Sequence, residues 1–105
     1  MKIISQFLIT IFFSLILTHE RAYSSENIKI GLMVPLTGEY KSIGKSILNA
    51  TKLAINKINN DNVLIVPKDT KGNPEITLKV AKELRDNDVQ IVIGPLFYKN
   101  LIYLN

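Results

Sequence analysis

Beyond residue 25, short apolar runs alternate with longer segments in which apolar residues recur at helical spacing. The short runs cover residues 28–34, 63–66 and 89–93, and each one is closed by proline or by a Gly-Pro pair. Their length and their nearly continuous apolar character are typical of strands that are buried on both faces of a sheet. We therefore expect three short buried strands.

The segment from Gly44 to Asn59 is predicted to be an amphipathic helix. Its apolar positions recur three and four residues apart while lysines occupy the other positions, and the cluster Asn59-Asn60-Asp61-Asn62 ends it. The apolar stripe consists of Ile47, Leu48, Ala54, Ile55 and Ile58.

A second helix is marked by clear start and stop signals. Asn73 is placed to act as the N-cap, Pro74 to occupy the first helical position, and Glu75 to favour the positive end of the helix dipole. The apolar stripe is Thr77, Val80, Ala81 and Leu84, and residues 86–88 end the helix. The order of elements is therefore strand, helix, strand, helix, strand.

This alternation with short connections predicts an α/β fold, with an open parallel sheet covered by helices on its faces. In such a sheet ligands bind beyond the carboxyl ends of the strands, where the strand order reverses. With the expected strand order 2-1-3, the facing loops are residues 36–40 and 94–98. A recognition site is expected there.

The first 24 residues have the pattern of a signal peptide. Met1 and Lys2 give a positive start, residues 3–18 are largely apolar, and Ala22-Tyr23-Ser24 places small residues where a signal peptidase requires them. The apolar run is shorter than the ~20 residues of a membrane-spanning helix. We expect cleavage after Ser24, a periplasmic location and contact with the membrane only during export, with an uncleaved N-terminal anchor as the alternative.

Composition limits the chemistry further. The chain has no cysteine, which excludes an acylated cysteine, disulfides and thiolate metal sites. Removal of Lys2, Arg21 and Glu20 with the leader leaves 11 basic and 8 acidic residues of the 13 and 9 in the whole chain. Because these charges are dispersed, they indicate a solvated surface rather than a nucleic-acid interface.

No catalytic set is recognisable, so we expect a protein that is not an enzyme and that needs no cofactor or metal. His19, the one histidine, lies in the leader. Asp69 follows the second strand, and a turn-forming role before Gly72 is favoured over a role as a site carboxylate. Tyr40 and Phe97 are equally compatible with packing over the sheet ends and with ligand contact.

The stretch from Gly38 to Ser46 resembles a phosphate-binding loop, and a nucleotide-binding protein is the rival hypothesis. Five residues separate its two glycines, Gly38 and Gly44, whereas a phosphate loop has four. The successive backbone amides would therefore be out of register with the phosphates.

Residues 28–97 resemble the start of the type I periplasmic-binding-protein family, the leucine-binding protein domain. The likeness is carried by "IKIGLMVPLTGEYKSIGKSILNATKLAINKIN", "KDTKGNPEITLKVAKEL" and "VQIVIGPL". It implies a non-catalytic solute-binding module, with residues 25–105 forming a truncated N-terminal lobe. It also implies a ligand half-site made of Thr37, Gly38, Tyr40, Ile43, Leu96, Phe97 and Tyr98.

Two branches of this family fit the residues. One contains receptors that deliver amino acids to an ABC permease, and the other contains activators of a penicillin-binding protein. The receptors usually have small hydroxyl residues after the third strand, where this chain has Phe97 and Tyr98, so the sequence is closer to the activators. A small amino-acid-like ligand, a permease and a penicillin-binding protein are thus the expected partners.

The portion after the leader is expected to be marginally stable. A domain of roughly 80 residues buries only about 60% of the surface that its unfolded chain exposes. The two outer strands, residues 63–66 and 89–93, would also present unpaired edges. We therefore expect the monomer to persist only transiently.

Overall fold

A three-stranded parallel sheet forms the centre of the fold in the computed structural model, which describes residues 1–6 and 26–104. Its central strand is β1 (Ile28–Val34), flanked by β2 (Val63–Asp69) and β3 (Ile91–Ile93) in the order β2-β1-β3. In the register, Ile30 is paired with Ile65 on one side and with Ile91 on the other. The expected fold class and strand order are therefore confirmed.

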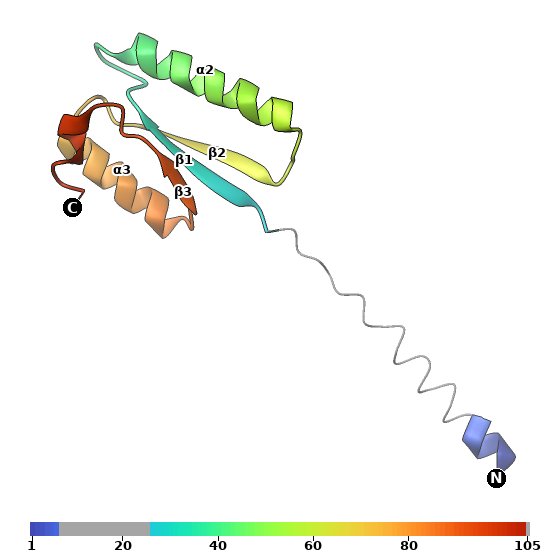
Figure 1. Cartoon of the computed structure of the whole chain (residues 1–105). Coiled ribbons are helices and arrows are strands. Elements are labelled where there is room, and N and C mark those ends of the chain that lie inside the picture. The colour runs from blue at the N-terminus through green and yellow to red at the C-terminus, as the bar shows by residue number, and fades with distance from the viewer. Residues whose placement is uncertain (7–25, 105) are drawn as a thin grey trace.

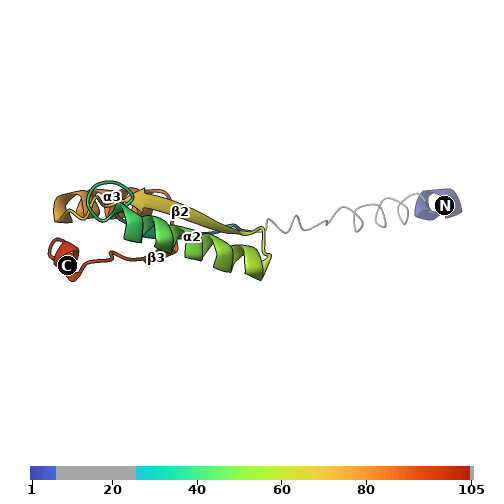
Figure 2. The ribbon, with the colours of Figure 1, turned by 90° about the horizontal axis from the view of Figure 1, so that it is seen from above.

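Two helices make the crossovers and lie on opposite sides of the sheet (Figure 1). Helix α2 (Lys41–Ile58) joins β1 to β2, and helix α3 (Pro74–Asp86) joins β2 to β3. Figure 2 shows that α2 runs alongside the strands rather than across them. The carboxyl ends of all three strands consequently lie at one edge of the sheet.

One part of the apolar core lies between the sheet and α3, while the buried Leu32 and Val34 of β1 belong to the opposite face of the sheet. Met33, Val80 and Leu84 are buried on the α3 side, and partly buried side chains that include Val66 and Val89 pack around them. Gly31 makes this approach possible, because a Cβ at that position would lie 2.8 Å from a terminal methyl of Leu84. Removing a buried leucine side chain typically costs about 2–5 kcal/mol, so Leu84 is a major source of stability.

Helix α2 buries fewer of its own residues than α3 does. Gly44 is its one buried residue, and a Cβ there would overlap the carbonyl oxygen of Pro35. Of the predicted apolar stripe, Ile47, Leu48 and Ile55 are half-buried, whereas Ala54 and Ile58 are exposed. The prediction of the stripe is thus wrong at its C-terminal end.

The boundaries also differ from those predicted. Helix α2 starts at Lys41 rather than Gly44, because the turn at Gly38 and Tyr40 already supplies its first hydrogen bonds. Strand β2 continues through Pro67 to Asp69, which is allowed because β2 is an edge strand and needs no hydrogen bond from that proline nitrogen on its open side.

Strand β3 is shorter and more exposed than expected. The N–H group of Val89 bonds the carbonyl of Leu84 in the last turn of α3, so β3 begins only at Ile91. Its residues Ile91, Val92 and Ile93 are 51%, 44% and 45% exposed. The prediction of three strands buried on both faces is therefore wrong for β3, and it is also wrong for β2, none of whose residues is buried.

The chain then turns back over α3. The short 3-10 helix η1 (Tyr98–Leu101) follows, and Leu104 packs against the core on the α3 side. Asn100 is fully buried, and its side-chain amide has no hydrogen-bond partner among the described residues.

The leader falls largely outside the described residues. Most of the predicted signal peptide, including the cleavage position at Ser24, lies in residues 7–25. Within residues 1–6 and 26–104, no helix combines the length and the apolar character needed to cross a membrane.

Candidate functional site

Three loops meet at the carboxyl edge of the sheet, one after each strand (Figure 1). They comprise residues 35–40 after β1, 70–73 after β2 and 94–97 after β3. This is the edge at which ligands bind in open parallel sheets, so these loops are the candidate site.

The first two loops are joined by the carboxylate of Asp69. Its Oδ1 accepts hydrogen bonds from the N–H groups of Leu36 at 2.8 Å and Thr37 at 3.4 Å, and its Oδ2 accepts one from the Thr37 hydroxyl. The N–H group of Lys71 also donates to Oδ1, at 2.9 Å. Asp69 therefore binds the loop after β1 while shaping its own turn.

These donors determine the charge state of Asp69. Partial burial raises the pKa of its carboxyl group, but the hydrogen bonds from the Thr37 hydroxyl and from the N–H groups of Lys71, Leu36 and Thr37 outweigh that effect and hold the pKa below its ordinary value of 3.8. The bond from Lys71 is the turn predicted from the sequence. The link to Leu36 and Thr37 was not predicted, and the only signal for it was an acidic residue at a strand end.

The first and third loops meet through two aromatic rings. Tyr40 and Phe97 pack edge to face, with ring centroids 4.6 Å apart. Gly72, from the second loop, lies beneath them, where a Cβ would stand 3.2 Å from Tyr40 Cδ2 and 3.8 Å from Phe97 Cε2. All three loops are therefore in contact, and the two rings pack on each other.

A cation lies close to this aromatic pair. The Nζ atom of Lys99 is 5.7 Å from the Phe97 centroid and 6.0 Å from the Tyr40 centroid, within the range of a cation–π interaction. Lys99 was not among the residues proposed from the sequence. The signal available was its place two residues after Phe97.

The remaining predicted site residues are less closely connected. Gly38 has a positive φ of 81° with open space around its Cα, as the turn before α2 requires. Ile43 and Leu96 are exposed, and Tyr98 is 88% exposed on η1. The structure thus brings Thr37 to Asp69 and Tyr40 to Phe97, while the other four residues lie nearby without mutual contacts of that kind.

The geometry disfavours the phosphate-loop hypothesis. Helix α2 begins at Lys41, so Lys41 to Ser46 are already helical. Gly44 is buried against Pro35 instead of facing an open loop. Successive N–H groups of this stretch therefore do not wrap around a phosphate as a phosphate-binding loop requires.

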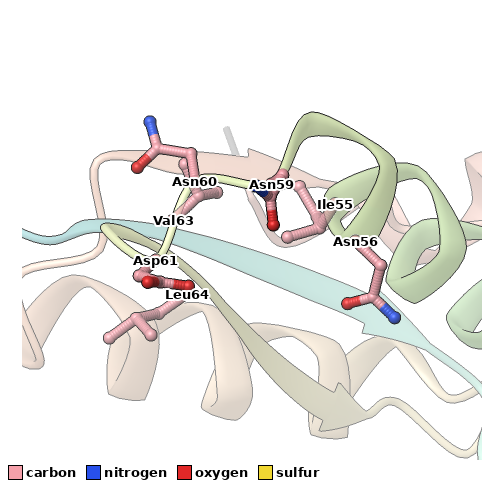
Figure 3. Close-up of a pocket in the computed structure, with 7 residues that line it drawn as sticks. All are labelled: Ile55, Asn56, Asn59, Asn60, Asp61, Val63 and Leu64. Atoms are coloured by element: carbon pink, nitrogen blue, oxygen red, sulfur yellow. The ribbon is translucent and has the colours of Figure 1, made fainter.

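A separate hollow lies at the opposite end of the sheet, between the end of α2 and the start of β2 (Figure 3). Its volume is about 400 Å³. Its lining residues are Ile55, Asn56, Asn59, Asn60, Asp61, Val63 and Leu64. Asp61 is the one carboxylate in this wall, and none of these residues belongs to the three-loop site. Across residues 1–6 and 26–104, no group of three or more histidine, cysteine or acidic side chains could hold a metal ion.

Comparison with known proteins shows which protein family the chain matches. The family model described as "Periplasmic binding protein" matches residues 27–100, which include all three strands and the three loops. The chain is also 28% identical over 76 residues to the Leu/Ile/Val-binding protein BraC3 of Rhizobium johnstonii. That alignment covers 67% of this chain and 21% of the relative, so the chain spans about a fifth of that protein's length.

Proposed function

Because the chain belongs to the periplasmic binding protein family, we propose that its three joined loops form one half of a cleft for a small amino-acid-like ligand. The observation that carries this proposal is the mutual fixing of the loops by Asp69 and by the Tyr40–Phe97 pair at the carboxyl edge of the sheet. A half-site held in place before the ligand arrives loses little ordering entropy on binding.

We propose a non-catalytic role in solute uptake. The family is one of solute-binding proteins, and the relative from Rhizobium is named for binding leucine, isoleucine and valine. Export by the predicted leader and delivery of the ligand to an ABC permease complete this proposal. The predicted half-site, Thr37, Gly38, Tyr40, Ile43, Leu96, Phe97 and Tyr98, remains part of it.

The geometry also refines the roles within that half-site. The Thr37 hydroxyl and N–H group both donate to Asp69, so Thr37 shapes the loop and its donors are already used. Tyr40 and Phe97 pack edge to face but are only partly buried, which leaves ring surface for a ligand.

The proposal is tested by an amide NMR titration of the isotope-labelled chain with leucine, isoleucine and valine. We expect weak binding, with shifts confined to the amides of residues 37–40 and 96–98, because a receptor cleft closes tightly only between two lobes. Calorimetry at micromolar concentration should accordingly detect nothing. Shifts scattered over α3, or none at saturating concentrations, would contradict the proposal.

Activation of a penicillin-binding protein is the second candidate, favoured by one observation. Phe97 and Tyr98 stand where receptors usually have small hydroxyl residues, Phe97 packs on Tyr40, and such rings are enriched at protein–protein interfaces. Titration with a purified penicillin-binding protein distinguishes the two. The second role would be established if that protein broadened the same loop amides and the three amino acids caused no amide shifts.

A further inference from the structure

The segment after β3 presents its side chains in the reverse of the usual pattern. Asn100 is fully buried, and neither its amide nitrogen nor its amide oxygen has a hydrogen-bond partner among the described residues. The large side chains around it are exposed instead, namely Tyr98 (88%), Leu101 (44%), Ile102 (68%) and Tyr103 (50%). A polar group therefore occupies the buried position while apolar groups face the solvent.

This arrangement makes the segment less stable than the rest of the fold. In water the Asn100 amide would donate and accept hydrogen bonds, and burying it without partners costs free energy. The exposed apolar side chains offset little of that cost, because they remain in contact with water. Opening of the segment restores the hydration of the amide, so the free energy of local opening is reduced.

Few contacts hold the segment in place. The N–H group of Asn100 donates to the carbonyl of Phe97 at 3.0 Å and that of Leu104 to the carbonyl of Leu101 at 2.9 Å, so both bonds are local. Within residues 1–6 and 26–104, no hydrogen bond or salt bridge joins residues 98–104 to a helix or strand of the sheet layer. We call residues 98–104 the strap, since it lies against α3 through packing alone, with Leu104 on the core.

The strap also carries the cation that lies over the candidate site. The Nζ atom of Lys99 is 5.7 Å from the Phe97 centroid and 6.0 Å from the Tyr40 centroid. Lys99 belongs to η1, so an opening of the strap withdraws its ammonium group from both rings. The position of the strap and the surroundings of the aromatic pair are therefore linked.

We propose that the strap opens and closes on α3 while the sheet and both long helices stay folded, and that closure places the Lys99 ammonium group over the aromatic pair. Asn100 keeps the two states close in free energy, because its amide is hydrated only in the open state. The strap is thus a conformational switch beside the half-site. This inference goes beyond the proposed function and does not depend on which ligand the half-site binds.

Native-state amide exchange of the isotope-labelled whole chain, followed by NMR, tests the opening. We expect the N–H groups of Asn100 and Leu104 to exchange through a local opening, and therefore faster than the N–H group of Val89, which bonds the carbonyl of Leu84 at the end of α3. Exchange of all three at one common opening free energy would show that the strap opens only when the whole protein unfolds, and would contradict the proposal.

Two substitutions of Asn100 should move the switch in opposite directions. Asn100→Leu replaces the unpaired amide with an apolar side chain of similar size, so the amides of residues 100 and 104 should exchange about tenfold more slowly. Asn100→Asp places an unpaired carboxylate at the same buried position, so at neutral pH it should favour the open strap and speed exchange. Asn49→Leu makes the first change at an exposed position of α2 and should leave exchange of the strap unaltered.

The ring signals of Tyr40 and Phe97 report the link to the candidate site. They should shift in opposite directions in Asn100→Leu and Asn100→Asp, because one variant keeps Lys99 over the rings and the other removes it. Ring signals that stay fixed while exchange of the strap changes would refute the link. Faster exchange in Asn100→Leu than in the wild type would show that the amide stabilises the closed strap, and would overturn the switch itself.

Discussion

At the scale of single residues, Asp69 is the side chain on which the candidate site depends most. It accepts hydrogen bonds from Leu36, Thr37 and Lys71, which belong to two different loops. A carboxylate suits this role because it only accepts hydrogen bonds, and hydrogen bonds to an ionised group are stronger than neutral ones.

Replacing this carboxylate with an amide should destabilise the protein. In Asp69→Asn the charge is lost, and an NH2 group replaces one carboxylate oxygen, so that a donor faces other donors. We therefore expect the free energy of unfolding to fall by about 1–2 kcal/mol. Urea denaturation measures this change. Asp61→Asn, at an exposed position in the turn before β2, is the control and should change stability little.

The same hydrogen bonds predict a dependence of stability on pH. The pKa of Asp69 is lower in the folded state than in the unfolded chain. Its contribution is therefore fully present above the unfolded pKa of about 3.8 and is lost as the pH falls further, through the folded pKa. Denaturation midpoints measured from neutral pH downwards should show this loss in the wild type and a smaller loss in Asp69→Asn. Identical pH profiles would contradict the assignment.

The sequence could predict only the local half of this arrangement. A turn after β2 follows from Asp69 and Gly72, which are close in sequence. The contact with Thr37 spans 32 residues and depends on the register of the pairing, in which Val34 lies opposite Asp69, and the pattern of apolar residues does not determine that register. For the same reason the sequence left open whether Tyr40 and Phe97 pack on each other.

At the scale of elements, the two helices start in different ways. Helix α3 has the N-cap predicted from its sequence, since the Asn73 side chain accepts hydrogen bonds from the N–H groups of Glu75 and Ile76. Helix α2 begins at Lys41, and Tyr40 at its N-cap position makes no side-chain cap hydrogen bond. Local signals therefore placed the start of α3 correctly and that of α2 three residues too late.

Removal of the α3 cap should have a modest and measurable effect. Asn73→Ala leaves two N–H groups of the first turn without their acceptor, which typically costs about 1 kcal/mol. Thermal or urea unfolding measures the loss. Asn49→Ala is the control. Asn49 lies at an exposed position inside α2 and is not an N-cap, so its replacement should be neutral or slightly stabilising.

Gly44 determines how closely α2 approaches the sheet. Alanine at this position gains about 1 kcal/mol in helix propensity, but its Cβ would overlap backbone atoms of Pro35, which cannot rotate away. We expect Gly44→Ala to lower the free energy of unfolding by a net ~2 kcal/mol or more. Ser46→Ala, on the exposed side of the same helix, is the comparison. Greater stability of Gly44→Ala would show that α2 is not held at this contact.

At the scale of the whole molecule, both sheet edges are open in the described part of the chain. Strand β2 exposes Leu64, and strand β3 exposes Ile91, Val92 and Ile93. The alternation of strands and helices was sufficient to predict the topology. It could not predict these exposures, because the burial of an edge strand depends on what lies beside it.

These open edges predict self-association. Unpaired strands with apolar side chains readily pair with another chain, so we expect a sedimentation coefficient that rises with protein concentration. Ile91→Lys should shift the equilibrium towards the monomer by placing a charge on the edge. Leu53→Lys, at a side chain that is 69% exposed on α2, should not. A monomer at all concentrations would contradict the expectation.

The leader supplies a prediction that is independent of the fold. Mass spectrometry of the exported protein should find Ser25 at the N-terminus if cleavage follows Ser24. A product that retains Met1 would support the uncleaved anchor instead.

The bridge from Asp69 to Thr37 also sets the order of events when the chain folds. The loop after β1 emerges from the ribosome first, but its final hydrogen-bond acceptor is made 32 residues later. That loop therefore reaches its final conformation only after β2 has paired with β1. A fluorescent reporter at the β1 loop should accordingly mature together with the pairing of β1 and β2, and no earlier.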